Sequence, residues 1–196
     1  MRQLGPSFPV KPFGAIMATS EEMLETARAE LERLFGPVEI QTSIFPVDEF
    51  TKYYRPEMGG GLVKQFLAFQ GTMSVADMNQ AKFETTHIED KFCVNGKRTI
   101  NLDPGYLTLD KLVLYTTKNF THRIFIERGL FAEITLTYTR NGWRTHSWTY
   151  PDYQTDAALA FFTRMRQSLY KTLQADGELP RFSINSTQPY PKGDPS

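Results

Sequence analysis

The sequence predicts an α+β fold: a mixed, largely antiparallel sheet that starts as a split βαβ arrangement (βαββαβ), continues as a β-meander, and is packed against a C-terminal helix. Three observations predict this fold. Strand and helix patterns alternate through the first hundred residues, short strand patterns then follow one another from 112 to 149, and one helical pattern closes the folded part.

The opening segment predicts a strand, a helix and a strand. Residues 11–18 form a short apolar run, and Thr19-Ser20-Glu21-Glu22 carries the capping pattern that begins a helix. The helix places Leu24, Ala27, Leu31 and Leu34 on one face and ends at Gly36-Pro37. Residues 38–45 alternate between apolar and polar side chains, which indicates a half-buried strand.

A second strand, helix and strand complete the split βαβ unit. Residues 62–69 predict a strand, and Ser74 with Asp77 three residues later marks the start of a helix. A strand over 98–102 follows that helix. The inward side of the helix is expected to carry Val75, Met78, Ala81, Thr85, Ile88 and Phe92.

The second half predicts a meander. Strand patterns occur at 112–116, 121–127, 130–138 and 143–149, with turns at Arg128-Gly129 and Asn141-Gly142. Asn-Gly between alternating runs is a strong hairpin signal. Asp103-Pro104-Gly105 is typical of a tight turn before the meander. A final helix over 156–173 has the spacing of a helix that covers a core.

Length and composition indicate one domain. At 196 residues the chain is expected to form a single domain, 1–196, with a folded part of about 11–175 and tails at 1–10 and 181–196 that are rich in Pro, Ser and Gly. Lys and Arg number 22, as do Asp and Glu, so a nucleic-acid partner is not expected.

The expected compartment is the cytoplasm. A single cysteine, Cys93, excludes an internal disulfide, and the N-terminus lacks a basic stretch followed by an apolar run. Cys93 lies near a predicted helix end and is expected to be buried. No apolar run approaches the roughly 18 residues that a membrane span needs.

Nucleotide and metal motifs are missing. The segment GGGLVK, residues 59–64, is followed by a predicted strand and has no Ser or Thr after its lysine, so it predicts a flexible connection and not a phosphate loop. His87, His122 and His146 lack the spacing of metal ligands. No metal is predicted, and no cofactor can be named.

The hairpin turns predict which side chains share a face. A two-residue loop at Arg128-Gly129 would place Ile124 opposite Glu133, and a loop at Asn141-Gly142 would place Thr137 opposite His146. Phe125 would then lie on the opposite, core face. The predicted polar face carries His122, Glu133, Thr135, Thr137, His146, Trp148 and Tyr150.

Two interpretations of this face remain open. An antiparallel sheet often has one side in water, which explains the face without a function. However, His, Trp and Tyr around a carboxylate are typical of a pocket lining. In that case Glu133 and His122 form a catalytic acid–base pair, and Thr135, Trp148 and Tyr150 contact the ligand. Asp103 is a third catalytic candidate, although a tight turn is by itself a sufficient explanation of this residue.

An anion contact is predicted beside this face. Thr117, Lys118 and Arg123 flank a short predicted loop, and their donors suit a phosphate or carboxylate group. Solvation explains Lys118 equally well. The predicted register turns Arg123 toward the core face, which weakens its candidacy.

Three segments resemble a known family. FTKYYRPEMG (50–59), INLDPGYLTLDKLVLYTTKNFTHRIFIERGLFAEITLTY (100–138) and WTYPDY (148–153) are similar in sequence and order to the bacterial and archaeal domain-of-unknown-function 4416 family, from residue 9 to about 173. The resemblance implies no activity. It adds Asn101 to the expected ligand contacts, because the family pattern includes Tyr53, Tyr54, Glu57, Met58, Gly59, Asn101, Asp103, Pro104, Gly105, Tyr106, Thr117, Lys118, His122, Arg123, Glu133, Thr135, Trp148, Tyr150, Pro151, Asp152 and Tyr153.

Two functions are therefore expected as alternatives. The first is a site for a small molecule, anionic or phosphate-bearing, with acid–base catalysis as one form of it. The second is a non-enzymatic adaptor whose aromatic surface binds a protein or single-stranded nucleic acid, through Tyr53, Tyr54, Trp148, Tyr150 and Tyr153. The first predicts that Glu133→Gln abolishes ligand binding and leaves the fold intact, whereas Glu127→Gln changes nothing. The oligomeric state is not predicted.

Overall fold

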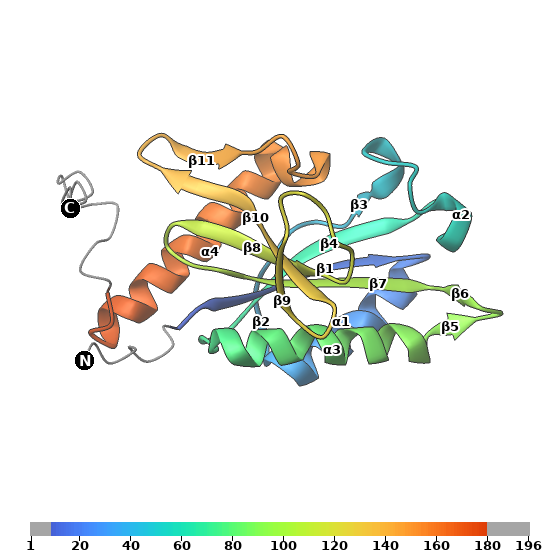
Figure 1. Ribbon diagram of the computed structural model, residues 1–196, viewed down its shortest axis with the longest axis horizontal. Coiled ribbons are helices and arrows are strands. Elements are labelled where there is room, and N and C mark those ends of the chain that lie inside the picture. Colours follow the sequence, from blue (N-terminus) through green and yellow to red (C-terminus); the bar gives the residue numbers. More distant parts are fainter. Residues whose placement is uncertain (1–8, 180–196) are drawn as a thin grey trace.

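The computed structural model describes residues 9–179 and has the expected α+β fold. Within these residues nine strands form one sheet, in the order β11-β10-β8-β7-β1-β4-β2, with β3 added to β4 and β9 added to β10. Every strand pair in this sheet is antiparallel. Figure 1 shows the sheet across the middle of the molecule.

The split βαβ prediction is confirmed by the first half of the chain. Its elements are β1 (Lys11–Ala18), α1 (Glu21–Phe35), β2 (Val38–Gln41), β4 (Val63–Phe69), α3 (Val75–Lys91) and β7 (Ile100–Leu107). The order β7-β1-β4-β2 interleaves strands from the two halves of this unit, with β1 and β4 in the centre. This is the arrangement that two βαβ halves produce when they share one sheet.

Both helices of this unit begin at the predicted serines. The hydroxyl of Ser20 accepts a hydrogen bond from the Met23 amide at 3.2 Å, and that of Ser74 accepts one from the Asp77 amide at 3.1 Å. Such a cap satisfies an amide that has no partner inside the helix. In α1 the buried face ends with Phe35 rather than the predicted Leu34.

The predicted strand over 38–45 is divided into two. β2 ends at Gln41, and β3 (Phe45–Pro46) pairs separately with β4. The hydroxyl of Thr42 accepts a hydrogen bond from the Phe66 amide at 3.1 Å, so a side chain takes the place of a ladder carbonyl there. A short helical turn, η1 (Val47–Glu49), and α2 (Arg55–Met58) then cross the end of the sheet.

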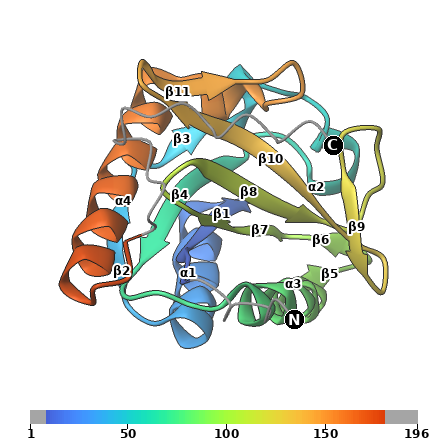
Figure 2. The ribbon, with the colours of Figure 1, turned by 60° about the vertical axis from the view of Figure 1, so that its left-hand side comes forward.

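Helices cover both faces of the sheet. α1 and α3 pack on one face, where Leu24 and Met78 belong to the core, and α4 (Asp156–Ala175) packs on the other, where Phe162 and Leu169 belong to it (Figure 2). α4 confirms the predicted C-terminal helix. In the described part of the chain, no helix is long and apolar enough to cross a membrane.

The predicted tails need one correction. Val10 is buried, and its backbone pairs with Met73, so the folded part begins before residue 11. Residues 1–8 and the predicted tail at 181–196 lie outside the described residues. The hairpin of β5 (Cys93–Val94) and β6 (Lys97–Arg98) projects at one end of the sheet, and Cys93 is exposed there, so its predicted burial is wrong.

The prediction of a turn at Asp103-Pro104-Gly105 is wrong, because these residues lie inside β7. β7 pairs with β1 along its whole length, but with β8 (Lys111–Thr116) only from Gly105 to Leu107. Pro104 is tolerated because the β8 side of the strand is unpaired at that point. Before Gly105 the two strands part, and we call this opening the fork.

Gly105 is required where the fork closes. A Cβ atom on Gly105 would lie 2.3 Å from the backbone oxygen of Val113, because β8 passes so close to β7. No side chain fits that distance. The glycine that suggested a turn therefore permits a close approach of two strands.

The meander exists, but its first register is partly wrong. β9 (Ile124–Glu127) and β10 (Leu130–Thr139) meet at the predicted Arg128-Gly129 loop, with Leu130 opposite Glu127. A bulge then places Ile124 opposite Ala132 instead of Glu133. Phe125 lies opposite Phe131 and so shares a face with Glu133, contrary to the prediction.

The second hairpin is shifted by two residues. Gly142 begins β11 (Gly142–Thr145) and lies opposite Thr139, so Thr137 faces Arg144 and not His146. Gly142 has a φ of 99°, as in a turn closed by a glycine bulge, rather than the mirror-image turn that Asn-Gly suggested. β11 ends before residue 146, and residues 121–123 precede β9, so these predicted strand positions lie in loops.

Candidate functional site

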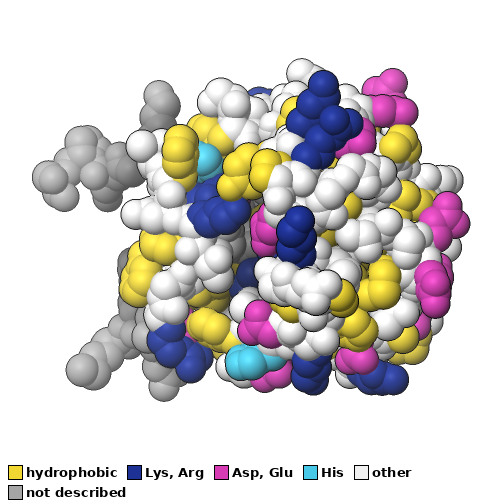
Figure 3. All heavy atoms as spheres, turned by 90° about the vertical axis from the view of Figure 1, so that its right-hand side faces the viewer, with side chains coloured by type: hydrophobic (Ala, Val, Ile, Leu, Met, Phe, Trp, Pro, Cys, Tyr) yellow, Lys and Arg dark blue, Asp and Glu magenta, His cyan; other side chains and the backbone are white. Residues whose placement is uncertain are grey.

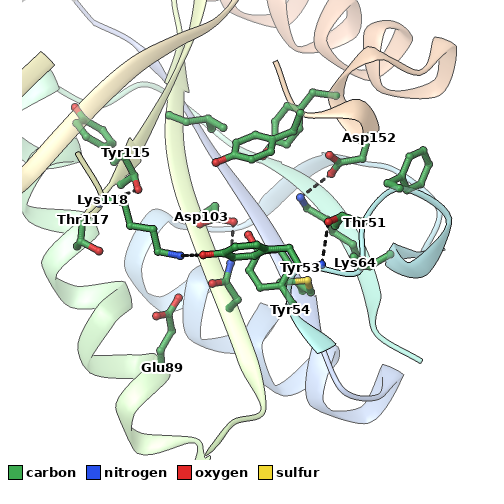
Figure 4. Close-up of a pocket in the computed structure, with 18 of the residues that line it drawn as sticks. Thr51, Tyr53, Tyr54, Lys64, Glu89, Asp103, Tyr115, Thr117, Lys118 and Asp152 are labelled. Atoms are coloured by element: carbon green, nitrogen blue, oxygen red, sulfur yellow. Dashed lines mark hydrogen bonds and ion pairs between the residues drawn. The ribbon is translucent and has the colours of Figure 1, made fainter. Parts of the chain in front are cut away.

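A pocket of about 640 Å³ lies at the fork. The separation of β7 from β8 opens the sheet, and segment 45–54 and η2 (Pro151–Gln154) form further walls. Side chains reach it from both faces of the sheet, because α3 contributes Lys82 and Glu89 through the opening. Figure 4 shows Lys118 and Tyr53 pointing toward each other in this space, whereas Tyr115 points away from it.

Three ion pairs stand in the wall of the pocket. They are Lys64 with Asp152 at 2.6 Å, Arg98 with Glu89 at 3.1 Å, and Arg123 with Glu133 at 2.7 Å. Each pair joins two different structural elements. Lys64 also lies over the ring of Tyr153, with its Nζ 5.0 Å from the ring centroid, so this cation is held by a carboxylate and an aromatic face.

Glu133 is buried and holds two neighbours from the loop before β9. Its Oε2 accepts a hydrogen bond from Arg123 Nε at 2.7 Å and lies 2.9 Å from His122 Nε2. Arg123 also donates to the hydroxyl of Tyr150 at 3.1 Å and to the carbonyl oxygen of Lys118 at 2.9 Å. The predicted Glu133–His122 contact is therefore present, although a loop and not the predicted register produces it.

Trp148 anchors this loop from outside the pocket. Its ring stacks between His122 and His146, with a centroid distance of 4.8 Å to each, and its Nε1 donates to the Ile134 carbonyl oxygen at 2.9 Å. Burial, with a smaller contribution from Arg144, lowers the pKa of His146. The stack is therefore built on a neutral His146 imidazole at neutral pH.

A chain of hydrogen bonds orients Asp103. Asn101 donates its amide to Asp103 Oδ2 at 2.8 Å and accepts from Arg98 at 2.9 Å. Arg98 binds both oxygens of Glu57, at 2.6 and 2.9 Å, and this contact lowers the pKa of Glu57. Asn101, predicted as a ligand contact, thus lies in the pocket lining and connects Asp103 to a surface ion pair.

Three tyrosine side chains of the pocket lining lie near enough to the Asp103 carboxylate for its charge to affect them. Burial raises the pKa values of Tyr54, Tyr150 and Tyr153, and nearby carboxylates, Asp103 among them, raise them further. All three phenols therefore remain protonated at neutral pH and keep a hydrogen to donate. Within residues 9–179 the Tyr153 hydroxyl is buried and has no hydrogen-bond partner.

Two lysines of the lining have no ion-pair partner in the described part of the chain. Lys118 donates to the Tyr53 hydroxyl at 3.1 Å, and its Nζ lies 5.0 Å from the centroid of the same ring (Figure 4). Lys82 is only 6% exposed and donates to the Leu102 carbonyl oxygen at 2.9 Å. Each ammonium group carries three donors, so both have unused ones.

Sequence reasoning missed Lys82 and Glu89, although a signal was present. Positions 78, 82, 85 and 89 follow one another at intervals of four and three residues, which is the stripe of one helix face. Met78 and Thr85 were recognised as inward, and the two charged residues on the same stripe were not. Lys64 and Asp152 gave no such signal, because they are distant in sequence.

Seven of the ten predicted site residues line the pocket: Asn101, Asp103, Thr117, Lys118, Arg123, Glu133 and Tyr150. His122 and Trp148 stand behind Glu133 and Arg123 instead of in the lining. Thr135 is fully buried away from the pocket, because a bulge between Ile134 and Leu136 interrupts the alternation of β10. Arg123 reaches the pocket wall because it lies in a loop.

The five aromatics of the adaptor hypothesis do not form one flat surface. Tyr53 is 65% exposed, whereas Tyr153 is 1% exposed and belongs to the core. Tyr54 and Tyr150 line the pocket. On the face drawn in Figure 3, Lys and Arg side chains lie among Asp and Glu side chains, without a separate patch of one sign.

No group of three His, Cys, Asp or Glu that could hold a metal ion occurs among residues 9–179.

Comparison with protein families gives a match over most of the chain. Residues 9–169 match the family described as Domain of unknown function (DUF4416), over the range in which the three motifs were found. No curated protein and no solved structure gives a significant match.

Proposed function

The chain belongs to the DUF4416 family, and from its site we propose that the pocket at the fork binds a small polar molecule that carries an anionic group. The observation that carries this proposal is the pair Lys82 and Lys118, which line one pocket without an ion-pair partner among residues 9–179. A buried ammonium such as that of Lys82 costs free energy unless an acceptor compensates it. An anionic ligand group supplies that compensation.

The walls support a ligand with an apolar or planar part. Phe45, Phe50, Tyr53 and Tyr54 line the same space as the charged groups. Small-molecule sites commonly combine apolar walls with a few placed polar groups. The volume of about 640 Å³ is within the range of such sites.

If the site is catalytic, the geometry favours Asp103 over Glu133 as the proton carrier. Glu133 Oε2 is engaged by Arg123 and His122, and Glu133 Oε1 is buried, so this carboxylate holds the Arg123 side chain in place. Asp103 faces the pocket and, within residues 9–179, accepts one hydrogen bond, from Asn101. We therefore propose Asp103 as general acid or base, and Glu133 with His122 as positioning residues.

Native mass spectrometry tests the proposal. The purified protein should carry an additional mass of a few hundred daltons that is released on denaturation. Lys118→Met should lose this mass, because it removes one of the two ammonium groups that would hold the anionic group. The variant should still fold, because Lys118 is exposed and its removal leaves the core unchanged. Lys171→Met, on the exposed side of α4, is the matched control and should keep the ligand. The absence of any bound mass, together with no thermal stabilisation by a panel of phosphate and carboxylate metabolites, would contradict the proposal.

The adaptor function rests on a different observation. Phe120, Ile124 and Phe125 are each about 60% exposed beside β9, and exposed apolar groups of this kind occur at protein contact surfaces. Under this rival proposal Phe125→Glu abolishes partner binding and Lys118→Met does not. A molecule bound in the pocket of the purified protein would decide for the small-molecule site.

A further inference from the structure

We infer that the ligand of this pocket is dipolar, with an anionic group held by Lys82 and Lys118 and a cationic group, such as an amine, held by Asp103. The inference rests on the proposed function and narrows it to one ligand class. It requires that the pocket contain uncompensated charges of both signs, close to aromatic walls.

The charges of the pocket lining are balanced. Five lining residues are basic and five are acidic: Lys64, Lys82, Arg98, Lys118 and Arg123, against Glu89, Asp90, Asp103, Glu133 and Asp152. Three ion pairs account for six of them. Within residues 9–179 the other four, Lys82, Lys118, Asp90 and Asp103, form no ion pair. The lining groups without an ion pair are therefore two positive and two negative side chains.

A ligand with one sign of charge fits only half of this set. An anion would compensate the lysines but would lie near the Asp103 carboxylate. A cation would compensate Asp103 but would lie near the two lysines. Charge complementarity gives specificity because like charges brought together in a desolvated site are unfavourable. A dipolar molecule compensates both signs and leaves neither lysine nor carboxylate without a partner.

Burial raises the pKa of Glu89 and the nearby Lys82 charge partly offsets this, but no ion pair joins the two side chains within residues 9–179. One oxygen of Glu89 accepts from the Leu102 amide at 2.5 Å and the other pairs with Arg98 at 3.1 Å. Lys82 donates to a backbone carbonyl oxygen instead, on the same side of the fork. The Lys82 ammonium therefore retains donors for a ligand oxygen.

The surroundings of Asp103 suit an ammonium group. A carboxylate can accept about four hydrogen bonds, and Asp103 accepts one, from Asn101, within residues 9–179. Aromatic rings attract cations, and two rings of this pocket already do so, since Lys64 lies over Tyr153 and Lys118 over Tyr53. Figure 4 shows Asp103 between the Lys118 side and the Lys64 side of the pocket.

A second, independent observation points to a ligand. Tyr153 is 1% exposed and lines the pocket, and its hydroxyl has no hydrogen-bond partner in the described part of the chain. Buried hydroxyl groups are normally paired, so the Tyr153 hydroxyl is placed to bind a polar atom of a bound molecule.

Two matched sets of probes test the inference by isothermal titration calorimetry at neutral pH and low salt. The first set is phenylalanine, 3-phenylpropanoate and phenethylamine, and the second is phosphoethanolamine, ethyl phosphate and ethanolamine. Each set contains one dipolar molecule, its anionic analogue and its cationic analogue, and the two sets distinguish a carboxylate from a phosphate. In at least one set the dipolar member should bind at least ten-fold more tightly than both analogues.

Two substitutions assign the ends of the ligand. Asp103→Asn should reduce the affinity for the dipolar probe at least ten-fold, to that of the anionic analogue, without weakening the anionic analogue itself. Lys118→Met should reduce it to the affinity of the cationic analogue. Lys171→Met should change neither value. If Asp103→Asn fails to fold, the comparison of probes on the unaltered protein still decides the question.

Three results would overturn the inference: an anionic analogue that binds as tightly as its dipolar relative, an unchanged affinity in Asp103→Asn, or no binding of any of the six probes. Native mass spectrometry separates this failure from failure of the proposed function. A bound molecule without a cationic group refutes only the dipolar ligand, whereas a pocket that binds no small molecule refutes both.

Discussion

Replacing Glu133 with glutamine should destabilise the protein. The same replacement at a solvent-exposed position of a strand would hardly change the stability. The Glu133 side chain is 2% exposed, and its partners Arg123 and His122 are 10% and 12% exposed. Glutamine keeps the shape and one acceptor oxygen but removes the charge. The Arg123 guanidinium then lies in a nearly dry site without its counter-ion.

The size of the effect follows from the two contacts that Glu133 makes. A hydrogen bond to a charged group contributes about 1.5 to 3 kcal/mol, and part of it survives with a neutral acceptor, so we expect a loss of about 2 kcal/mol. A chain of this length loses about 2 to 4 °C of unfolding temperature per kcal/mol. The expected decrease for Glu133→Gln is therefore about 4 to 8 °C.

Thermal unfolding followed by circular dichroism measures this decrease. Glu127→Gln is the matched control. The Glu127 side chain is 45% exposed, and its ion pair with Arg128, at 3.4 Å, lies at the surface. The unfolding temperature of this variant should therefore change by no more than about 1 to 2 °C. The double variant Arg123→Met with Glu133→Gln tests the cause. It should be more stable than the sum of the single losses predicts, by about 1 kcal/mol or more.

An unfolding temperature of Glu133→Gln within about 1 °C of that of the unaltered protein, or additive effects of the two substitutions, would contradict this prediction. Either result would mean that the buried contact between Glu133 and Arg123 does not hold the loop before β9.

Three further substitutions test other parts of the structure by urea unfolding. Gly105→Ala should cost about 1 to 3 kcal/mol, because its Cβ would lie 2.3 Å from the Val113 carbonyl oxygen, and unchanged stability would contradict the close approach of β7 and β8. Thr155→Ala should cost about 1 kcal/mol, since the Thr155 hydroxyl accepts from the Ala158 amide at the start of α4, and a cost near zero would refute this cap. Tyr153→Phe should leave stability unchanged or raise it, because the hydroxyl it removes has no partner within residues 9–179; a loss above about 1 kcal/mol would show that it has one.

Several residues of the candidate site could be predicted from the sequence, although the sheet register that positions them could not. Glu133, Asp103 and Lys118 were selected by residue type and by the family resemblance, and all three line the pocket. Glu133 was expected in a pocket from a sheet register that is wrong, because a bulge near the Arg128-Gly129 loop shifts β9 by one residue. A bulge depends on how two strands twist and pack, and no residue pattern at this hairpin announced it.

Features that depend on a few neighbouring residues were predictable from the amino-acid sequence. The serine caps of α1 and α3, the loop at Arg128-Gly129 and the order of strands and helices in the split βαβ unit follow from local hydrogen bonds and from the period of apolar side chains.

The position of the pocket and the charges that it leaves without an ion pair depend on how distant parts of the chain pack together. Lys64 and Asp152 are 88 residues apart, and they meet because β4 and η2 reach the same end of the sheet. Asp103 faces the pocket because β8 leaves β7 at Gly105. The separation of two strands and the pairing of distant charges are set by packing across the whole sheet, and a local pattern such as Asp-Pro-Gly, which favours a turn on its own, is overruled by it.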